Sequence, residues 1–275
     1  MTTTSSPVYD SDQRRLRFAE LRHFWQYRSL VRLLAARELT SRYKRSLLGV
    51  WWTLLNPLLT VGVFWLVFSQ IFSRQGTLFP FIVYLTAGVL LAGFFAQGVN
   101  AAGAGLVHNR GVLAKVYVPP EVFSLAAALA AAANFAISLV PLVIIQIIQG
   151  VGVPLDFLLV PVSVLFMLML VTGIGLVVAS VAVMFYDVFD LVRVITTLVT
   201  YMAATFYPID VVPERWQLLI KLNPLYHHLV VFRSFAYGDW FSWTSFIIAG
   251  TTGLAALAFG VWVFSRNWRN VVVSL

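Results

Sequence analysis

The sequence predicts an all-α membrane protein with six transmembrane helices, an N-terminal amphipathic interface helix and a re-entrant outer hairpin. The 275 residues are 60% hydrophobic and only 11% charged, whereas soluble domains carry about 25% charged residues. The chain also contains charge-free runs long enough to cross about 30 Å of hydrocarbon, which takes about 20 helical residues. These runs lack the period-2 alternation that a membrane β-barrel requires.

The spans are predicted from the spacing between charged residues. Five intervals between charges are long enough, and a sixth, between Arg193 and Asp210, is short but can span if it starts near Val188. The six spans are expected at residues 51–73, 78–107, 122–149, 157–186, 188–208 and 241–264. Residues 1–50 then form a cytoplasmic N-terminal segment, and residues 51–275 form one transmembrane domain.

The uneven distribution of basic residues predicts the orientation. Of the 19 Lys and Arg residues, 15 fall on one side of the predicted membrane, and the other four are Arg74, Arg215, Lys221 and Arg233. Because cytoplasmic loops are enriched in Lys and Arg, both termini are expected in the cytoplasm. This asymmetry also accounts for the net charge of +8, so no nucleic acid partner is expected.

Two regions are predicted to be neither spans nor simple loops. In Leu16–Thr40, Leu30, Leu33 and Leu34 form an apolar stripe and Arg28 lies on another face, which is typical of a helix lying along the membrane surface. A soluble cytosolic helix is the alternative.

The second region is residues 209–238, where two short apolar stretches flank Asn223-Pro224. Proline interrupts a helix, and irregular backbone at membrane depth needs protein or water around it. We expect a re-entrant hairpin that forms an outer gate, and the alternative is an external surface loop. The candidate gate residues are Trp216, Asn223, Pro224, Leu225, Leu229, Phe232 and Arg233.

Several kinds of chemistry have no motif in the sequence. None of the three Lys residues lies in a GxxxxGK[ST] motif, so the chain is not expected to bind ATP through a P-loop. There is no Cys, and the adjacent His227 and His228 are expected on different helix faces, which makes a poor metal pair. No catalytic, cofactor-binding or metal-binding residue is therefore predicted on this chain.

Several motifs resemble one family of membrane proteins. Ser41–Gly49 (SRYKRSLLG), followed by Trp51-Trp52 and Asn56-Pro57, is similar to the signature before the first span of ABC-2 type polysaccharide exporter permeases, often called Wzm or TagG-like. These proteins export O-antigen, capsule, teichoic acid or galactan. Tyr186-Asp187 stands where relatives often have Arg-Asp, which puts a role for that pair in doubt. The signature residues are Arg42, Tyr43, Lys44, Ser46, Gly49, Trp51 and Trp52.

The segment of residues 108–121, between the second and third spans, resembles the family's ATPase-coupling segment, although an ordinary cytoplasmic loop is the alternative. The matching residues are Asn109, Arg110, Val112, Leu113, Lys115, Tyr117, Pro119, Pro120 and Glu121. Asn223-Pro224 followed by Arg233 resembles the family's outer hairpin. The resemblance covers nearly the whole chain, from about Arg22 to Arg269.

The resemblance implies a transport subunit rather than an enzyme. It would move a lipid-linked polysaccharide from the cytoplasmic to the outer face of a bacterial plasma (inner) membrane, among the membrane lipids. No cofactor is expected on this chain; ATP and Mg would bind two copies of a partner ATPase. Six helices are too few to enclose a wide sugar path, so a homodimer with the path at its interface is expected. The substrate would be a polyprenyl-linked polysaccharide.

Aromatic side chains are candidates to stack on the sugar, with packing against lipid or the protein core as the alternative. They are Trp51, Phe94, Phe95, Tyr201, Phe206 and Tyr207. A membrane enzyme acting on a lipid-linked sugar is the rival class, but Asp187 and Asp190 are the only near acidic pair, and an ion pair with Arg193 explains them as well. The chain is rich in Ala and uses Arg over Lys, which is typical of a GC-rich source. Within the family that the chain resembles, this is consistent with the actinobacterial galactan-exporter branch, although no residue fixes the sugar.

Overall fold

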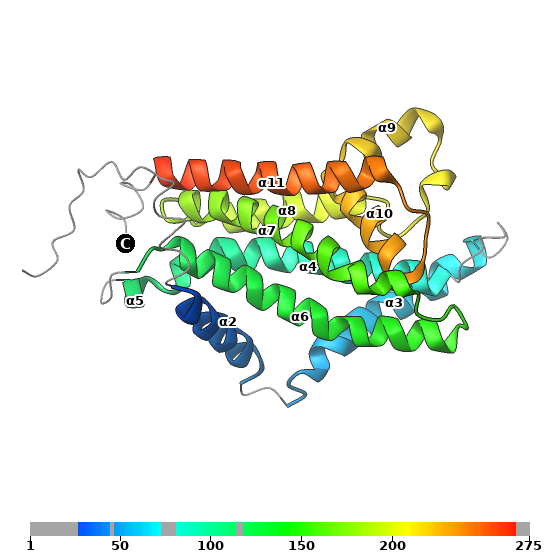
Figure 1. The fold of residues 1–275 in the computed structure, drawn as a ribbon, viewed down its shortest axis with the longest axis horizontal. Coiled ribbons are helices and arrows are strands. Elements are labelled where there is room, and N and C mark those ends of the chain that lie inside the picture. Colours follow the sequence, from blue (N-terminus) through cyan, green and yellow to red (C-terminus); the bar gives the residue numbers. More distant parts are fainter. Residues whose placement is uncertain (1–26, 45–46, 73–80, 114–117, 268–275) are drawn as a thin grey trace, which may run out of the picture.

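The computed structural model describes residues 27–44, 47–72, 81–113 and 118–267, and these ranges contain helices and connecting turns but no strand (Figure 1). The elements follow in the order α2 (Arg28–Tyr43), α3 (Trp51–Phe72), α4 (Phe81–His108), α5 (Arg110–Leu113), α6 (Glu121–Ile148), η3 (Leu155–Leu159), α7 (Val160–Ala182), α8 (Val188–Tyr201), η4 (Ile209–Val211), α9 (Glu214–Leu222), α10 (Pro224–Tyr237) and α11 (Trp243–Arg266).

Helix α4 lies at the centre of the bundle. It packs against α6 and α7 over most of its length, and α3, α8 and α10 contact its remaining faces. A helix that is apolar all round is suited to such a position, and α4 has no charged residue before His108. The main core extends from α4 into α6, α7 and α10, with Phe94, Phe135 and Phe232 among its largest members.

Small residues let α7 and α11 approach closely. A Cβ atom added to Gly173 would collide with the backbone of Ala256, and one added to Gly260 would collide with the backbone of Gly173. Packing of small residues is the usual way in which helices associate in a bilayer, where no hydrophobic effect separates protein from lipid. The pair α7–α11 therefore has the contact surface expected of neighbouring membrane helices.

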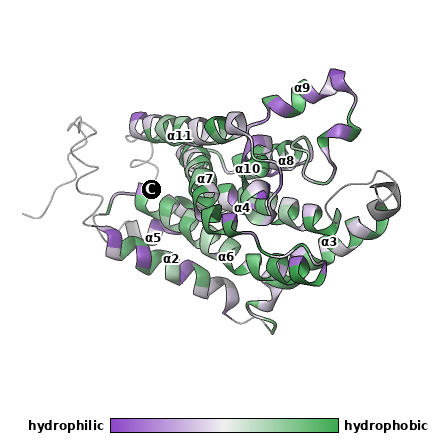
Figure 2. Ribbon diagram, turned by 45° about the vertical axis from the view of Figure 1, so that its right-hand side comes forward, coloured by the Kyte–Doolittle hydropathy of each residue, from purple (hydrophilic) through white to green (hydrophobic). Residues whose placement is uncertain are grey.

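The two ends of the bundle differ in composition. Helices α2 and α5 and the end of α11 lie at one end, here called the α5 end, and α9 and the start of α10 lie at the other, here called the α9 end (Figure 1). Figure 2 shows hydrophilic residues on α2 and α9 and mainly hydrophobic residues along the helices between them. This banding is the pattern of a protein that crosses a membrane.

The prediction of an all-helical membrane protein is confirmed. Four helices in the described ranges are long and apolar enough to cross a membrane, namely Phe81–His108, Glu121–Ile148, Leu155–Ala182 and Trp243–Arg266, and Trp51–Val67 is a shorter apolar helix. The chain is a multi-pass membrane protein.

The predicted fifth span, residues 188–208, is shorter than expected. Helix α8 has 14 residues and ends at Tyr201, which gives it a length of about 21 Å against about 30 Å of hydrocarbon. A bend follows, in which Ala204 has a φ of +53°. The count of six spans therefore stays a prediction.

Helix α2 packs along α6. Val31 is buried, and Leu30 and Leu34 pack against the same small core. Leu33, which the sequence placed in the apolar stripe, is 67% exposed. The buried face is thus turned by part of a turn from the predicted one. Residues 16–26 of the predicted interface helix lie outside the described ranges.

Candidate functional site

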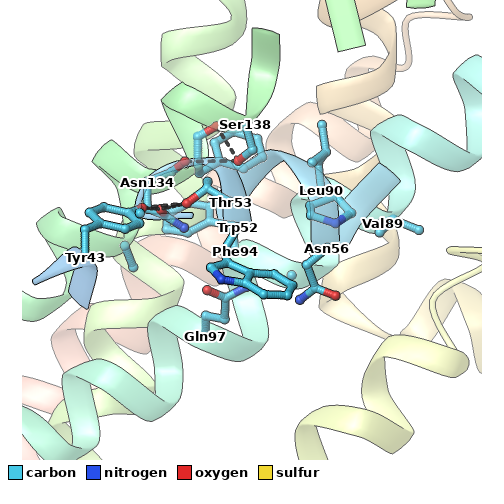
Figure 3. Close-up of a pocket in the computed structure, with 15 residues that line it drawn as sticks. Tyr43, Trp52, Thr53, Asn56, Val89, Leu90, Phe94, Gln97, Asn134 and Ser138 are labelled. Atoms are coloured by element: carbon cyan, nitrogen blue, oxygen red, sulfur yellow. Dashed lines mark hydrogen bonds between the residues drawn. The ribbon is translucent and has the colours of Figure 1, made fainter. Parts of the chain in front are cut away.

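A partly open cleft of about 200 Å³ lies between α3, α4, α6 and the end of α2. Its lining combines aromatic rings with uncharged polar side chains (Figure 3). The polar ones are Tyr43, Thr53, Asn56, Gln97, Asn134 and Ser138. At 1.5 Å per residue, Gln97 lies about 16 Å along α4 from its last residue, so the cleft lies well inside the length of the bundle.

Three side chains form one wall of the cleft by bonding to one another. The Tyr43 hydroxyl donates to the Asn134 carboxamide oxygen, Thr53 Oγ1 donates to the same oxygen at 3.0 Å, and the Tyr43 and Thr53 hydroxyl oxygens are 2.6 Å apart. The connection from α2 to α3, where Gly49 has a φ of +50°, is therefore fastened to the middle of α6.

Two further carboxamides face the open part of the cleft. Asn56 on α3 and Gln97 on α4 are both exposed. No hydrogen bond to the Asn56 side chain occurs within the described part of the chain. The ring of Trp52 stands beside them, and 52% of that residue is exposed. Phe94 and Phe135 stack at 5.1 Å behind them.

A second polar cluster lies towards the α9 end and centres on Arg233, which is buried. Its guanidinium donates to the carbonyl oxygen of Ala204 at 3.3 Å and to that of Thr205 at 3.0 Å. It also lies 3.5 Å from the centre of the Tyr84 ring, an arrangement that stabilises a cation. The Tyr84 hydroxyl donates to the carbonyl oxygens of Ala204 and Tyr207.

These contacts tie three helices together, and we call them the Arg233 clasp (Tyr84, Ala204, Thr205 and Arg233). Because Ala204 has a left-handed backbone conformation, its carbonyl oxygen and that of Thr205 point towards α4 and α10. Without Tyr84 and Arg233, these two buried carbonyl oxygens would lack hydrogen-bond donors. The clasp leaves no room for a side chain at position 88, because a Cβ on Gly88 would collide with Thr205 O and with Arg233 Nη2.

The helix break that the sequence predicts at Asn223-Pro224 lies between α9 and α10. Asn223 caps α10 by accepting from Leu225 N at 3.0 Å, and its amide donates to Val199 O on α8 at 2.8 Å. Pro224 occupies the first position of α10, where proline is well tolerated. Leu225, Leu229 and Phe232 are fully buried, whereas Trp216 on α9 is exposed.

The two adjacent histidines point to different partners. His227 Nε2 lies 2.8 Å from Lys221 O and therefore carries the proton, while Nδ1 lies 3.1 Å from Ser245 Oγ. His228 Nε2 lies 3.4 Å from Thr252 Oγ1. Both rings thus tie α10 to its neighbours, and no group of three potential metal ligands occurs among the described residues.

The predicted coupling segment is described only in part. Arg110 donates to Val183 O at 3.1 Å, and the Asn109 amide donates to Gly105 O. Val112 and Leu113 complete α5, Pro119 is half-buried, Pro120 is buried, and Glu121 begins α6. Lys115 and Tyr117 lie outside the described residues, so docking on a partner stays a prediction.

The predicted signature residues lie in different environments. Tyr43 and Trp52 line the cleft, and Trp51 and Lys44 are exposed. Ser46 lies outside the described ranges, as does the side chain of Arg42.

The six aromatic residues proposed for the glycan path do not share one surface. Phe94 and Phe95 are buried in the core, whereas Trp51 and Tyr201 are more than half exposed. Phe206 stacks on Phe64 of α3 at 4.4 Å and lies 5.4 Å from the Tyr201 ring. The Tyr207 hydroxyl donates to Tyr201 O. The exposed members therefore follow α3 and α8.

The one acidic pair considered for catalysis has a simple environment. Asp190 and Arg193 form an ion pair of 3.6 Å on α8, and both side chains are exposed. Surface pairs of this kind contribute little to stability. Asp187, at the N-cap of the same helix, is exposed too.

The residues that sequence reasoning missed are Tyr84, Gln97, Thr53 and Asn134. Their only signal was a polar residue inside an otherwise apolar run.

Comparison with known proteins identifies the family. The model of the ABC-2 type transporter family matches residues 29–237, a range that includes α2, both polar clusters and the α9–α10 break. The chain belongs to the ABC-2 type transporter family. The match ends at Tyr237, the last residue of α10.

Relatives of this ABC-2 chain carry names that specify a cargo. It is 28% identical over 219 residues to the O-antigen export system permease protein RfbA of Myxococcus xanthus, covering 79% of this chain and 84% of the relative. It is 21% identical over 238 residues to the protein of the same name from Klebsiella pneumoniae, covering 86% and 91%. It is 24% identical over 212 residues to the capsule polysaccharide export inner-membrane protein CtrC of Neisseria meningitidis, covering 76% and 80%.

Proposed function

We propose that this chain is the permease subunit of an ATP-driven exporter that moves a lipid-linked polysaccharide from the cytoplasmic to the outer face of the plasma membrane. The observation that carries the proposal is the family match over residues 29–237, joined to relatives named as O-antigen and capsule polysaccharide export proteins. The polar cleft and the exposed aromatic residues on α3 and α8 provide surfaces suited to a hydroxyl-rich cargo.

The orientation follows from the basic residues. The α5 end carries most of the Arg residues of the described ranges, and cytoplasmic segments are enriched in Lys and Arg. The α5 end is therefore cytoplasmic, and α9 and α10 lie at the outer face. In a six-span arrangement α3 and α8 supply the first and fifth spans, and α8 is completed by the bend at residues 202–207.

The energy comes from a partner, since this chain has no P-loop motif. Two copies of an ATPase that binds ATP and Mg would dock on residues 108–121. Arg110 and Glu121 lie at the ends of that segment, and its Pro119-Pro120 pair stiffens the chain. Movement there would reach the bundle through α4, which ends at the segment, and through α6, which begins there.

A second copy of the chain completes the path. Helix α3 is largely exposed along Leu58–Val67, and α8 exposes Leu191, Val194 and Leu198. Two such surfaces facing each other across a two-fold axis would enclose a path that one chain cannot. The exposed aromatic residues Trp51 and Tyr201 would then face the glycan, and α9 and α10 would close its outer end.

Deletion of the gene tests this function in the source cell. The account expects the surface polysaccharide to disappear and its lipid-linked form to accumulate on the cytoplasmic leaflet, with both effects reversed by the intact gene. A membrane enzyme would instead leave the lipid-linked glycan with an altered structure. Accumulation of a glycan of changed composition, with no block in export, would therefore overturn the proposal.

A further inference from the structure

The cleft between α3, α4 and α6 presents groups that hydrocarbon cannot solvate. Asn56 and Gln97 are exposed carboxamides on two helices of a membrane protein, and the Asn56 side chain has no hydrogen-bond partner within the described ranges. A buried amide without a partner costs about 2–7 kcal/mol in an apolar medium. The Asn56 side chain therefore faces water or a polar ligand and not lipid tails.

The lining of the cleft identifies the chemistry of that ligand. None of the residues that line it is charged, so it has no counter-charge for a phosphate, a diphosphate or an acidic sugar. Carboxamides and hydroxyls both donate and accept hydrogen bonds, as the hydroxyls of a neutral sugar do. Trp52, which is 52% exposed, offers a flat apolar surface for the face of a sugar ring.

The size and stiffness of the cleft limit the ligand further. About 200 Å³ is less than the roughly 300 Å³ at which pockets for drug-sized ligands begin, so the space fits one sugar ring and not a length of chain. The bonded group of Tyr43, Thr53 and Asn134 fixes one wall before any ligand arrives. A preformed wall lowers the entropy cost of binding.

We propose that this cleft is a binding subsite for a single neutral sugar ring of the transported glycan. Asn56 and Gln97 hydrogen-bond its hydroxyls, and Trp52 covers one face. The proposal rests on the proposed function for the source of the sugar. It places the ring against α3 in the half of the bundle nearer the α5 end, beside the connection that joins α2 to α3.

Cysteine probes test the subsite directly, since the chain has no Cys of its own. Asn56→Cys and Gln97→Cys are placed singly in the chain, which is assembled with its ATPase in lipid nanodiscs and treated with a charged, water-soluble thiol reagent. Leu254→Cys is the control, because Leu254 is an exposed residue in the middle of α11, a helix outside the proposed path, and it does not line the cleft. The probes are soluble oligosaccharides of galactose, mannose, glucose and rhamnose, and an oligosaccharide of sialic acid as the anionic comparison.

The expected result is that both cleft cysteines react and Leu254→Cys, which faces lipid, does not. At least one neutral oligosaccharide should slow the reaction of both by about tenfold, equivalent to about 1.4 kcal/mol, and the sialic acid oligomer should not. Unreactive cleft cysteines, which would mean that lipid or a second copy covers the site, overturn the proposal. Reaction without protection by any neutral sugar, or equal protection by the anionic one, overturns it too.

Transport by apolar variants separates this proposal from the function on which it rests. Asn56→Leu and Gln97→Met keep the approximate shape of each side chain and remove its hydrogen-bonding groups. We expect an apparent KM for lipid-linked glycan raised by about tenfold for both variants. Asn56→Leu should also keep the thermal stability of the wild type, since the Asn56 side chain has no hydrogen-bond partner within the described ranges to lose. If the wild-type chain exports glycan and the variants keep its KM, only the subsite fails. If the wild-type complex exports none, the proposed function fails.

Discussion

Arg233 occupies a position where a cation needs a special environment. It is buried, and its partners are the carbonyl oxygens of Ala204 and Thr205 and the face of Tyr84. Hydrogen bonds to charged groups contribute about 1.5–3 kcal/mol each when buried. The clasp therefore holds the segment after α8 against α4 and α10. Its acceptors are main-chain carbonyl oxygens, so changing the side chain at position 204 or 205 would not remove them.

Gly88→Ala tests the clasp without removing any of its groups. The added methyl group would displace Thr205 O and the Arg233 guanidinium, and overpacking of this kind costs about 1–3 kcal/mol. We expect a lower Tm for the detergent-solubilised protein. Gly62→Ala is the matched control, because nothing lies within 4 Å of a Cβ at Gly62 and Ala favours a helix. Equal Tm values for Gly88→Ala and the wild type would contradict the role of the clasp.

At the scale of elements, the long helices were predictable and their partners were not. The spans expected at 78–107, 122–149 and 241–264 correspond to Phe81–His108, Glu121–Ile148 and Trp243–Arg266, because charges mark where a helix leaves the hydrocarbon.

Helix α8 was overestimated for a physical reason. Its residues stay apolar beyond Tyr201, but the backbone turns at Ala204 and is held there by Tyr84 and Arg233, which lie about 120 and 30 residues away in the sequence. A pattern read along the chain contains no such contact. The cleft was missed for the same reason, since Gln97 and Asn134 meet only when α4 packs on α6.

The coupling segment is tested by Lys115→Ala with Tyr117→Ala. Loss of a buried aromatic anchor at an interface costs about 2 kcal/mol or more, so the double variant should bind the ATPase more weakly and export little glycan while inserting normally. Arg193→Ala, an exposed cation at the same end of the bundle, is the control for lost charge. Wild-type export by the double variant at equal expression would rule out docking through these residues.

The proposed outer gate can be tested at two buried leucines of α10. Leu225 and Leu229 are fully buried, and Leu222 at the end of α9 is 69% exposed. As single cysteines, the first two should react slowly with an aqueous thiol reagent at rest and faster when the ATPase engages nucleotide, and Leu222→Cys should react in both states. Labelling of Leu225→Cys and Leu229→Cys that is low with and without nucleotide would make the hairpin static packing and not a gate.

For the whole molecule, the location of the two termini tests which end of the bundle faces the cytoplasm. Reporter domains fused before Arg14 and after Leu275 should both behave as cytoplasmic, because 15 of the 19 Lys and Arg residues lie on the predicted inner side. The same reporter inserted at Gly238, the left-handed residue that ends α10, should behave as external. An external signal from either terminal fusion would contradict the arrangement with six spans.

The proposed roles of the two proteins, transport by this chain and ATP hydrolysis by its partner, can be tested with the purified components. In the proposed assembly this chain forms the membrane path and has no P-loop motif, and a partner would carry the ATP site. The most direct measurement is therefore translocation of lipid-linked glycan by vesicles that contain the purified chain with its ATPase, the chain alone, or the ATPase alone. The account predicts ATP-dependent appearance of glycan on the far leaflet with both proteins, and neither hydrolysis nor translocation with the chain alone. Hydrolysis by the rigorously purified chain, or no translocation by the complete pair supplied with the source strain's lipid-linked glycan, would contradict it.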